Sequence, residues 1–119
     1  MKKKLFLIIC LLGALDLGTA NNIISNDGIT IRANSTNGND RSSSIIASIN
    51  GHTLTVVFTE NLGNVTIEVK DVYGDAVDLD LIGTPNGYEC YIPLAGHYTV
   101  YFKLTNGDTY CGDFDVTDN

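Results

Sequence analysis

The stretch SIIASINGHTLTVVFTE, residues 44–60, decides the fold of this chain. Its Asn50-Gly51 pair is the strongest short-range signal for a β-hairpin, because both residues of such a turn adopt positive φ angles. After the turn, Leu54, Val56 and Phe58 alternate with residues of the opposite face, which is the period of a strand with one buried face. The stretch therefore predicts an antiparallel strand pair that covers a core.

Further short β-type runs follow, and turn residues end each of them. Valine and isoleucine alternate with polar residues at 64–71, and runs at 76–81, 87–92 and 97–104 continue the pattern. The last of these leads into a second hairpin, which ends near residue 116. About seven short strands at a spacing of roughly 8–12 residues predict an all-β fold, an antiparallel sandwich of the immunoglobulin or fibronectin type III kind.

Tyr98 supports this architecture. It stands at the start of the 97–104 run, with Gly96 two residues and Leu94 four residues before it. In immunoglobulin-like sandwiches, a tyrosine at this corner donates a hydrogen bond to a backbone carbonyl a few residues upstream. We therefore predict a tyrosine corner at Tyr98.

The start of the chain has the pattern of a secretory signal peptide, residues 1–20. Three lysines precede the apolar run Leu5–Leu15, and Gly18 and Ala20 are small residues suited to cleavage before Asn21. The apolar run is too short to span a bilayer. We expect an exported chain, in the periplasm, at the cell surface or outside the cell, without stable membrane insertion after cleavage.

After the signal, the composition changes once. Residues 21–43 are rich in Asn, Ser, Asp and Gly, so we expect a flexible lead-in with at most a short strand at Ile29–Arg32. The periodic pattern begins at Ser44, and residues 44–119 are expected to form one β-sandwich domain.

The chain is acidic, with a formal net charge of −7. Three of its seven Lys and Arg residues belong to the signal, so the mature chain is more acidic still. Such a surface repels phosphate backbones and anionic lipids, and we expect no binding to nucleic acid or to membrane surfaces.

Two cysteines, Cys90 and Cys111, remain after cleavage, and an even pair in an exported protein favours a disulfide. Alternation places Cys90 on the core face. The direction of Cys111 depends on the last hairpin: a loop of Asn106-Gly107-Asp108 turns it outward, and a loop of Asn106-Gly107 turns it inward opposite Phe102. The second register allows a Cys90–Cys111 crosslink, with a bulge at Gly112. Two separate thiols are the alternative.

No pattern in the chain indicates catalysis or a cofactor. His52 and His97 lack the spacing of a zinc site, and the carboxylates of residues 75–80 form no calcium-loop motif. Motifs for a nucleophile, a phosphate loop or a metalloprotease helix are also missing. We expect a protein that is not an enzyme and that holds no metal or other cofactor. Tyr91 and Tyr101 have outward parity and are candidate ligand contacts.

Four motifs carry a family resemblance: the Asn50-Gly51 hairpin, the turn and strand Leu62–Ile67, the strand start Ala95–Thr99 and the closing hairpin Asn106–Phe114. Together they resemble a family of small exported proteins of unknown function from Bacteroides-type bacteria. The resemblance covers about residues 44–117. It implies an immunoglobulin-like sandwich in the periplasm or at the cell surface, and it supplies no catalytic residues.

Fold, export and the missing catalytic motifs predict a non-catalytic binding or adhesion module for an unknown protein or glycan ligand. The alternative is a small exported peptidase inhibitor that acts through loops around Asn61, Pro85–Tyr88 and Asn106–Asp108. The oligomeric state is left open by the sequence.

Overall fold

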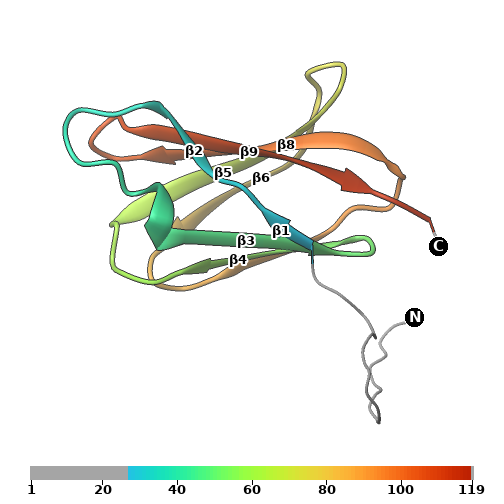
Figure 1. The fold of residues 1–119 in the computed structure, drawn as a ribbon, viewed down its shortest axis with the longest axis horizontal. Coiled ribbons are helices and arrows are strands. Elements are labelled where there is room, and N and C mark those ends of the chain that lie inside the picture. Colours follow the sequence, from blue (N-terminus) through green and yellow to red (C-terminus); the bar gives the residue numbers. More distant parts are fainter. Residues whose placement is uncertain (1–26, 119) are drawn as a thin grey trace, which may run out of the picture.

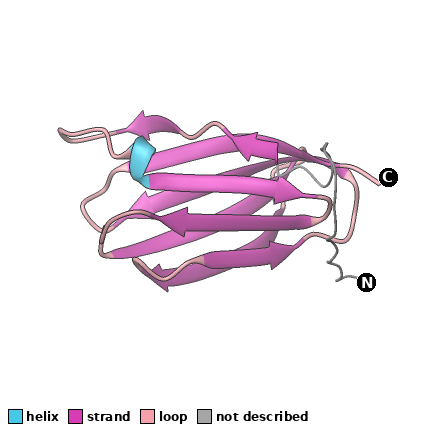
Figure 2. Cartoon of the chain, turned by 60° about the horizontal axis from the view of Figure 1, so that its bottom comes forward, coloured by secondary structure: helices cyan, strands magenta, loops and turns pink. Residues whose placement is uncertain are grey.

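A computed structural model describes residues 27–118, so the predicted signal peptide lies outside the described residues. Nine strands within this range form two antiparallel sheets that pack face to face (Figure 1). The strands are β1 (Asp27–Ile29), β2 (Arg32–Ser35), β3 (Ile45–Asn50), β4 (Thr53–Phe58), β5 (Asn64–Asp71), β6 (Ala76–Gly83), β7 (Tyr88–Tyr91), β8 (Gly96–Leu104) and β9 (Thr109–Val116). A 3₁₀ turn, Ser42–Ser44, stands at the end opposite the C-terminus (Figure 2).

The strand order confirms the predicted sandwich. One sheet has the order β1-β3-β4-β7 and the other the order β2-β9-β8-β5-β6. From β3 to β9 the chain crosses between the sheets as in fibronectin type III and related immunoglobulin-like folds. The Asn50-Gly51 hairpin joins β3 to β4 with Asn50 opposite Thr53, as expected from the sequence.

The two extra strands come from the lead-in, which is more ordered than predicted. Residues 27–35, here called the N-terminal strap, pair with β3 through β1 and then cross to pair with β9 through β2. This corrects both the flexible lead-in up to residue 43 and the short strand at Ile29–Arg32, where the chain in fact changes sheets. Ile29 and Ile31 pack against the core at the crossing. The core surface that they cover is formed by strands far away in the sequence, so local composition does not reveal this burial.

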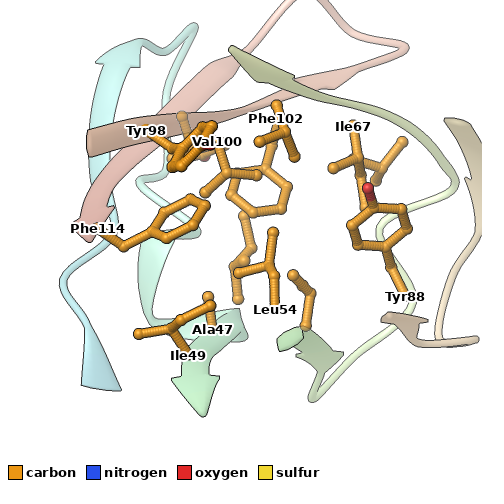
Figure 3. Packing of buried hydrophobic residues seen from close by; sticks show 14 of the residues in the cluster. Ala47, Ile49, Leu54, Ile67, Tyr88, Tyr98, Val100, Phe102 and Phe114 are labelled. Atoms are coloured by element: carbon orange, nitrogen blue, oxygen red, sulfur yellow. The ribbon is translucent and has the colours of Figure 1, made fainter. Parts of the chain in front are cut away.

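The core lies between the sheets and is built from alternate residues of the strands. Phe102 and Leu54, from opposite sheets, point toward one another in its middle and have no exposed surface (Figure 3). The ring of Phe102 meets Phe58 edge-on with centroids 6.4 Å apart, and Tyr98 stacks on Phe114 at 5.8 Å. The first contact joins the two sheets, and the second joins the neighbouring strands β8 and β9 on the inner face of one sheet.

The tyrosine corner predicted at Tyr98 is confirmed. The Tyr98 hydroxyl donates a hydrogen bond to the carbonyl oxygen of Leu94 at 2.6 Å. This bond ties the connection between β7 and β8 to the start of β8, as in other immunoglobulin-like sandwiches.

The last hairpin takes neither of the two registers derived from the sequence. Phe102 pairs with Tyr110, and the Leu104 N–H donates to the Asp108 carbonyl at 2.9 Å. The loop therefore has three residues but begins at Thr105, one residue earlier than in the three-residue alternative. In this register Cys111 lies opposite Tyr101 and faces away from the core.

Within residues 27–118 both cysteines are free, so the structure does not contain the predicted Cys90–Cys111 disulfide. The strand registers give the reason. Cys90 pairs with Leu54 and faces the core from one sheet, whereas Cys111 faces outward on the other. Two such side chains cannot bring their Cβ atoms to the separation of about 4 Å that a disulfide needs.

Candidate ligand-binding site

Four loops lie together at one end of the sandwich, opposite the end that carries the C-terminus (Figure 1). They are residues 36–44, 59–63, 84–87 and 105–108. The positions that the sequence offered as inhibitor loops, around Asn61, Pro85–Tyr88 and Asn106–Asp108, all fall at this end. In immunoglobulin variable domains the antigen-binding loops are gathered at one end in a similar way.

A pocket of about 380 Å³ opens between three of these loops. Its wall consists of Asn37, Asn39, Arg41, Asn61, Leu62, Leu104, Asn106 and Asp108. Six of these eight side chains are polar, whereas ligand pockets in proteins are usually lined mostly by apolar groups. The pocket therefore suits a ligand that is itself rich in hydrogen-bonding groups.

One wall of the pocket is held by Asp108, which is only 3% exposed. Its carboxylate accepts hydrogen bonds from the backbone N–H of Asn37 at 2.8 Å and from the Asn106 side chain at 3.2 Å. The Asn37 side chain in turn donates to the carbonyl oxygen of Asn106 at 3.1 Å. These bonds fasten the loop before β3 to the last hairpin, so this part of the pocket is preformed.

The opposite wall is fixed through Arg41. Its backbone N–H donates to the hydroxyl of the buried Tyr110 at 2.9 Å, and its guanidinium contacts the Glu60 carboxylate at 2.9 Å. Glu60 also accepts a hydrogen bond from Ser44. Asn61 caps its own turn by accepting the Gly63 N–H at 2.8 Å. The loop after β4 is thereby tied to the loop before β3.

Some hydrogen-bonding capacity in the wall is unused. Among the described residues, the Asn39 side chain has no hydrogen-bond partner, and Arg41 engages its guanidinium only through Nη1. An amide offers two donors and an acceptor, and a guanidinium offers five N–H donors. The pocket thus presents both donors and acceptors to a ligand.

Asp40 stands in the sequence between the pocket residues Asn39 and Arg41 but does not itself line the pocket. This carboxylate accepts the backbone N–H of Ser42 at 2.8 Å, and that hydrogen bond lowers the pKa of Asp40 below its ordinary value. The loop that carries Asn39 and Arg41 thus also carries an ionised carboxylate, which repels anionic ligands.

The two tyrosines proposed as ligand contacts do not share a site. Tyr91 is 67% exposed and stacks on His52 at the end of the sandwich opposite the pocket, with ring centroids 5.6 Å apart. Tyr101 lies on the outer face of the five-stranded sheet, with the Lys70 ammonium 5.4 Å from its ring centre. Neither lines the pocket.

The two histidines have partners of their own. His97 contacts Asp115 at 2.7 Å, while His52 lies between the Ile92 carbonyl and Asp118. Over residues 27–118, no group of three or more His, Cys, Asp or Glu side chains is arranged to hold a metal ion. The same range contains no helix of the length and apolarity that crossing a membrane requires.

Comparison with known proteins gives a family for this fold. The sequence model of a protein family, the domain of unknown function DUF3244, matches residues 22–116. The chain belongs to this family. The crystal structure of a DUF3244 family protein from Bacteroides vulgatus ATCC 8482, which has an immunoglobulin-like β-sandwich fold, superposes with a TM-score of 0.64 at 18% identity. The match covers 76% of this chain and 98% of that one.

The DUF3244 assignment confirms the family resemblance and the fold class expected from the sequence. No curated protein matches the chain. The family is one of unknown function, so its name assigns no ligand and no activity. A function for this DUF3244 protein has to be argued from its own surface.

Proposed function

We propose that this protein is a non-catalytic binding module that holds a short saccharide, or the end of a glycan, in the loop-end pocket. The observation that carries the proposal is a polar pocket on a rigid sandwich in which Asn39 and Arg41 keep unused hydrogen-bonding groups. Function on common folds resides in such local sites rather than in the fold itself.

The chemistry of a sugar matches this wall. Each hydroxyl group is both a donor and an acceptor, and the asparagine amides of the pocket supply the same two functions side by side. Leu62 and Leu104 add a small apolar surface against which the C–H face of a sugar ring can pack. The charge of Asp40 favours a neutral saccharide over a phosphorylated or carboxylated one.

A peptidase inhibitor is less well supported. The three loops proposed for it do lie at the same end, but two of them, those around Asn61 and Asn106–Asp108, border a hollow. A loop that enters a protease cleft has to protrude, whereas a hollow accommodates a small ligand. We further propose that the module works outside the cytoplasm, in accordance with the signal pattern of residues 1–20.

A glycan array followed by titration calorimetry with the best neutral oligosaccharide tests the proposal. We expect Asn39→Ala to weaken binding about tenfold, which corresponds to roughly one hydrogen bond. Asn86→Ala is the matched control, because Asn86 belongs to a loop of the same end but does not line the pocket. Wild-type affinity in Asn39→Ala, or no binding to any neutral glycan, contradicts the proposal. Inhibition of exported peptidases by the protein supports the alternative instead.

A further inference from the structure

The five-stranded sheet ends on β6 with no further strand beyond it among the described residues. β6 has eight residues and contains neither proline nor lysine, although a register shift against β5 leaves Val77 as an extra residue near its start. From Asp78 to Gly83 the strand pairs with β5 without interruption. A long edge strand of this kind can accept a strand from another molecule.

The outer face of β6 is apolar. Leu79 and Leu81 alternate along the strand and are both 62% exposed, and Val77, the extra residue at the register shift, is 45% exposed. The residues of β5 opposite the two leucines are polar, since Leu79 lies opposite Glu68 and Leu81 opposite Thr66. The two leucines, with Val77 before them, therefore form an exposed apolar stripe along the edge of the sheet.

The inner face of the same strand carries Asp78 and Asp80. They lie opposite Val69 and Ile67, two core residues, but Asp80 is exposed. The buried hydroxyl of Tyr88 donates a hydrogen bond to Asp78, and burial raises the pKa of Tyr88, so this hydroxyl remains a donor. The edge thus pairs an apolar outer side with an anionic inner side.

Along β6, the backbone N–H and C=O groups of every second residue form no hydrogen bond with β5. Thr84 N–H donates to the Gly63 carbonyl at 3.1 Å, which sets the phase of the ladder between β5 and β6. In an antiparallel pair only every second residue bonds to the partner strand. Asp78 and Asp80 therefore bond to β5, whereas Leu79 and Leu81 direct their N–H and C=O groups to the open edge.

We propose that β6 is a docking edge for an extended segment of a partner protein in which apolar and basic residues alternate. The apolar side chains of that segment pack beside Val77, Leu79 and Leu81, and its basic side chains lie opposite Asp78 and Asp80. This interaction is independent of the loop-end pocket and goes beyond the proposed glycan binding.

Charge complementarity selects this partner over a second copy of the chain. If two β6 strands paired antiparallel around Leu79 or Asp80, the aspartates of one copy would face those of the other, and like charges opposite one another are destabilising. A basic partner also releases a backbone donor. Asp80 accepts the Leu81 N–H at 2.8 Å in the free protein, and a cation that attracts this carboxylate frees the N–H for the incoming strand.

Synthetic peptides test the backbone pairing without altering the protein. We expect Lys-Val-Lys-Val-Lys-Val-Lys to bind and the version with glutamate in place of lysine not to bind. N-methylation at the valines, whose N–H groups face β6 in this arrangement, is expected to abolish binding, while N-methylation at the lysines is expected to leave it. Absence of binding by the lysine peptide, equal binding by the glutamate peptide, or equal effects of the two methylation patterns overturns the proposal.

Variants of the full protein locate the site. Asp80→Asn is expected to weaken peptide binding about tenfold at low salt, and Leu81→Lys is expected to remove it. Val57→Lys is the matched control, because Val57 is a similarly exposed residue, 49%, on the outer face of the other sheet. Unchanged peptide binding in Leu81→Lys, or a protein dimer that this substitution dissociates, overturns the proposal. Glycan binding by the same variants is expected to remain at the wild-type level, so failure of one proposal is distinguishable from failure of the other.

Discussion

The two edge strands of the five-stranded sheet, β2 and β6, differ in length, in polarity and in their contacts. The β2 edge is short and polar, has a register shift between Ala33 and Ser35, and is tied to β9 by Arg32, whose guanidinium lies 3.4 Å from the Asp113 carboxylate. The β6 edge is twice as long, has a register shift near its start and carries an apolar outer stripe. We call the β2 edge, which the N-terminal strap itself forms, the closed edge, and the β6 edge, which no described segment covers, the open edge.

The difference shows what the strap does. By crossing from one sheet to the other, it adds a strand to each and covers the adjacent edges of both. The crossing is so close to β9 that only glycine fits at position 112. Among the described residues no such segment covers β6, which has only a register shift and the side chains of Asp78 and Asp80 to limit strand pairing. This uncovered edge is the one that we propose as the docking edge.

The largest effect is expected from comparing the core with the open edge. Phe102→Ala removes a fully buried ring and should lower the free energy of unfolding by about 3–5 kcal/mol. Leu81→Ala should change it by less than about 0.5 kcal/mol, because this side chain is exposed. Urea unfolding of both variants measures the two values. A loss of more than about 2 kcal/mol in the free energy of unfolding of Leu81→Ala would mean that the stripe supports the fold rather than a partner.

The closed edge is tested next through Gly112. A Cβ atom at this position would lie 2.8 Å from side-chain carbons of Ile29 and Ile31, and 2.9 Å from the Thr30 oxygen. Gly112→Ala should therefore destabilise the protein by about 1–3 kcal/mol through overpacking. Gly28→Ala is the control, because nothing lies within 4 Å of its Cβ position. Equal stabilities of the two variants would show that the strap is not packed on β9.

Thiol labelling provides a third comparison. Cys111 is 2% exposed beside the closed edge, opposite Arg32 in the register of β2 and β9, and should react with iodoacetamide at least about tenfold more slowly than in the unfolded chain. Burial raises the pKa of the Cys90 thiol, so that residue should also react slowly near neutral pH. For the chain from Asn21 onward, which lacks Cys10, mass spectrometry after denaturation should find two reactive thiols. Finding none without prior reduction would instead establish the disulfide.

The smallest effect concerns Asp113 at the closed edge. A hydrogen bond from the Thr99 hydroxyl at 2.7 Å, assisted by Arg32, lowers the pKa of Asp113. A carboxyl whose pKa is lower in the folded state contributes stability above its unfolded pKa, and that contribution is lost as the pH falls through the folded value. Asp113→Asn should therefore cost no more than about 0.5 kcal/mol at pH 7 and nothing at strongly acidic pH. Thermal unfolding across the acidic range measures this difference, and an effect that grows on acidification has the wrong sign.

Local signals made much of the fold predictable. Asn50-Gly51 determined the first hairpin, and the position of Tyr98 after Leu94 determined the tyrosine corner. For the last hairpin the sequence predicts the wrong register. The loop starts one residue earlier than expected, and contacts with distant parts of the chain decide this position. Asp108 is buried against Asn37, and the Tyr110 hydroxyl holds the backbone of Arg41.

The pocket and the open edge were hidden for different reasons. Asn37 and Asn39 stand in a segment whose composition resembles a disordered linker, and only the strap brings that segment to the last hairpin. In β6 the sequence correctly predicts a strand over residues 76–81. Alternation shows that one face is apolar, but it does not show which face is buried, and here Leu79 and Leu81 face solvent.

Amide hydrogen exchange followed by NMR tests most directly the claim that one edge is closed and the other open. With the lysine–valine peptide present, we predict that the Leu79 amide changes from fast to slow exchange, that Asp78 and Asp80, already bonded to β5, change little, and that β2 does not respond. Protection that appears on β2, or that leaves the Leu79 amide as fast as before, would contradict the assignment of β6 as the docking edge.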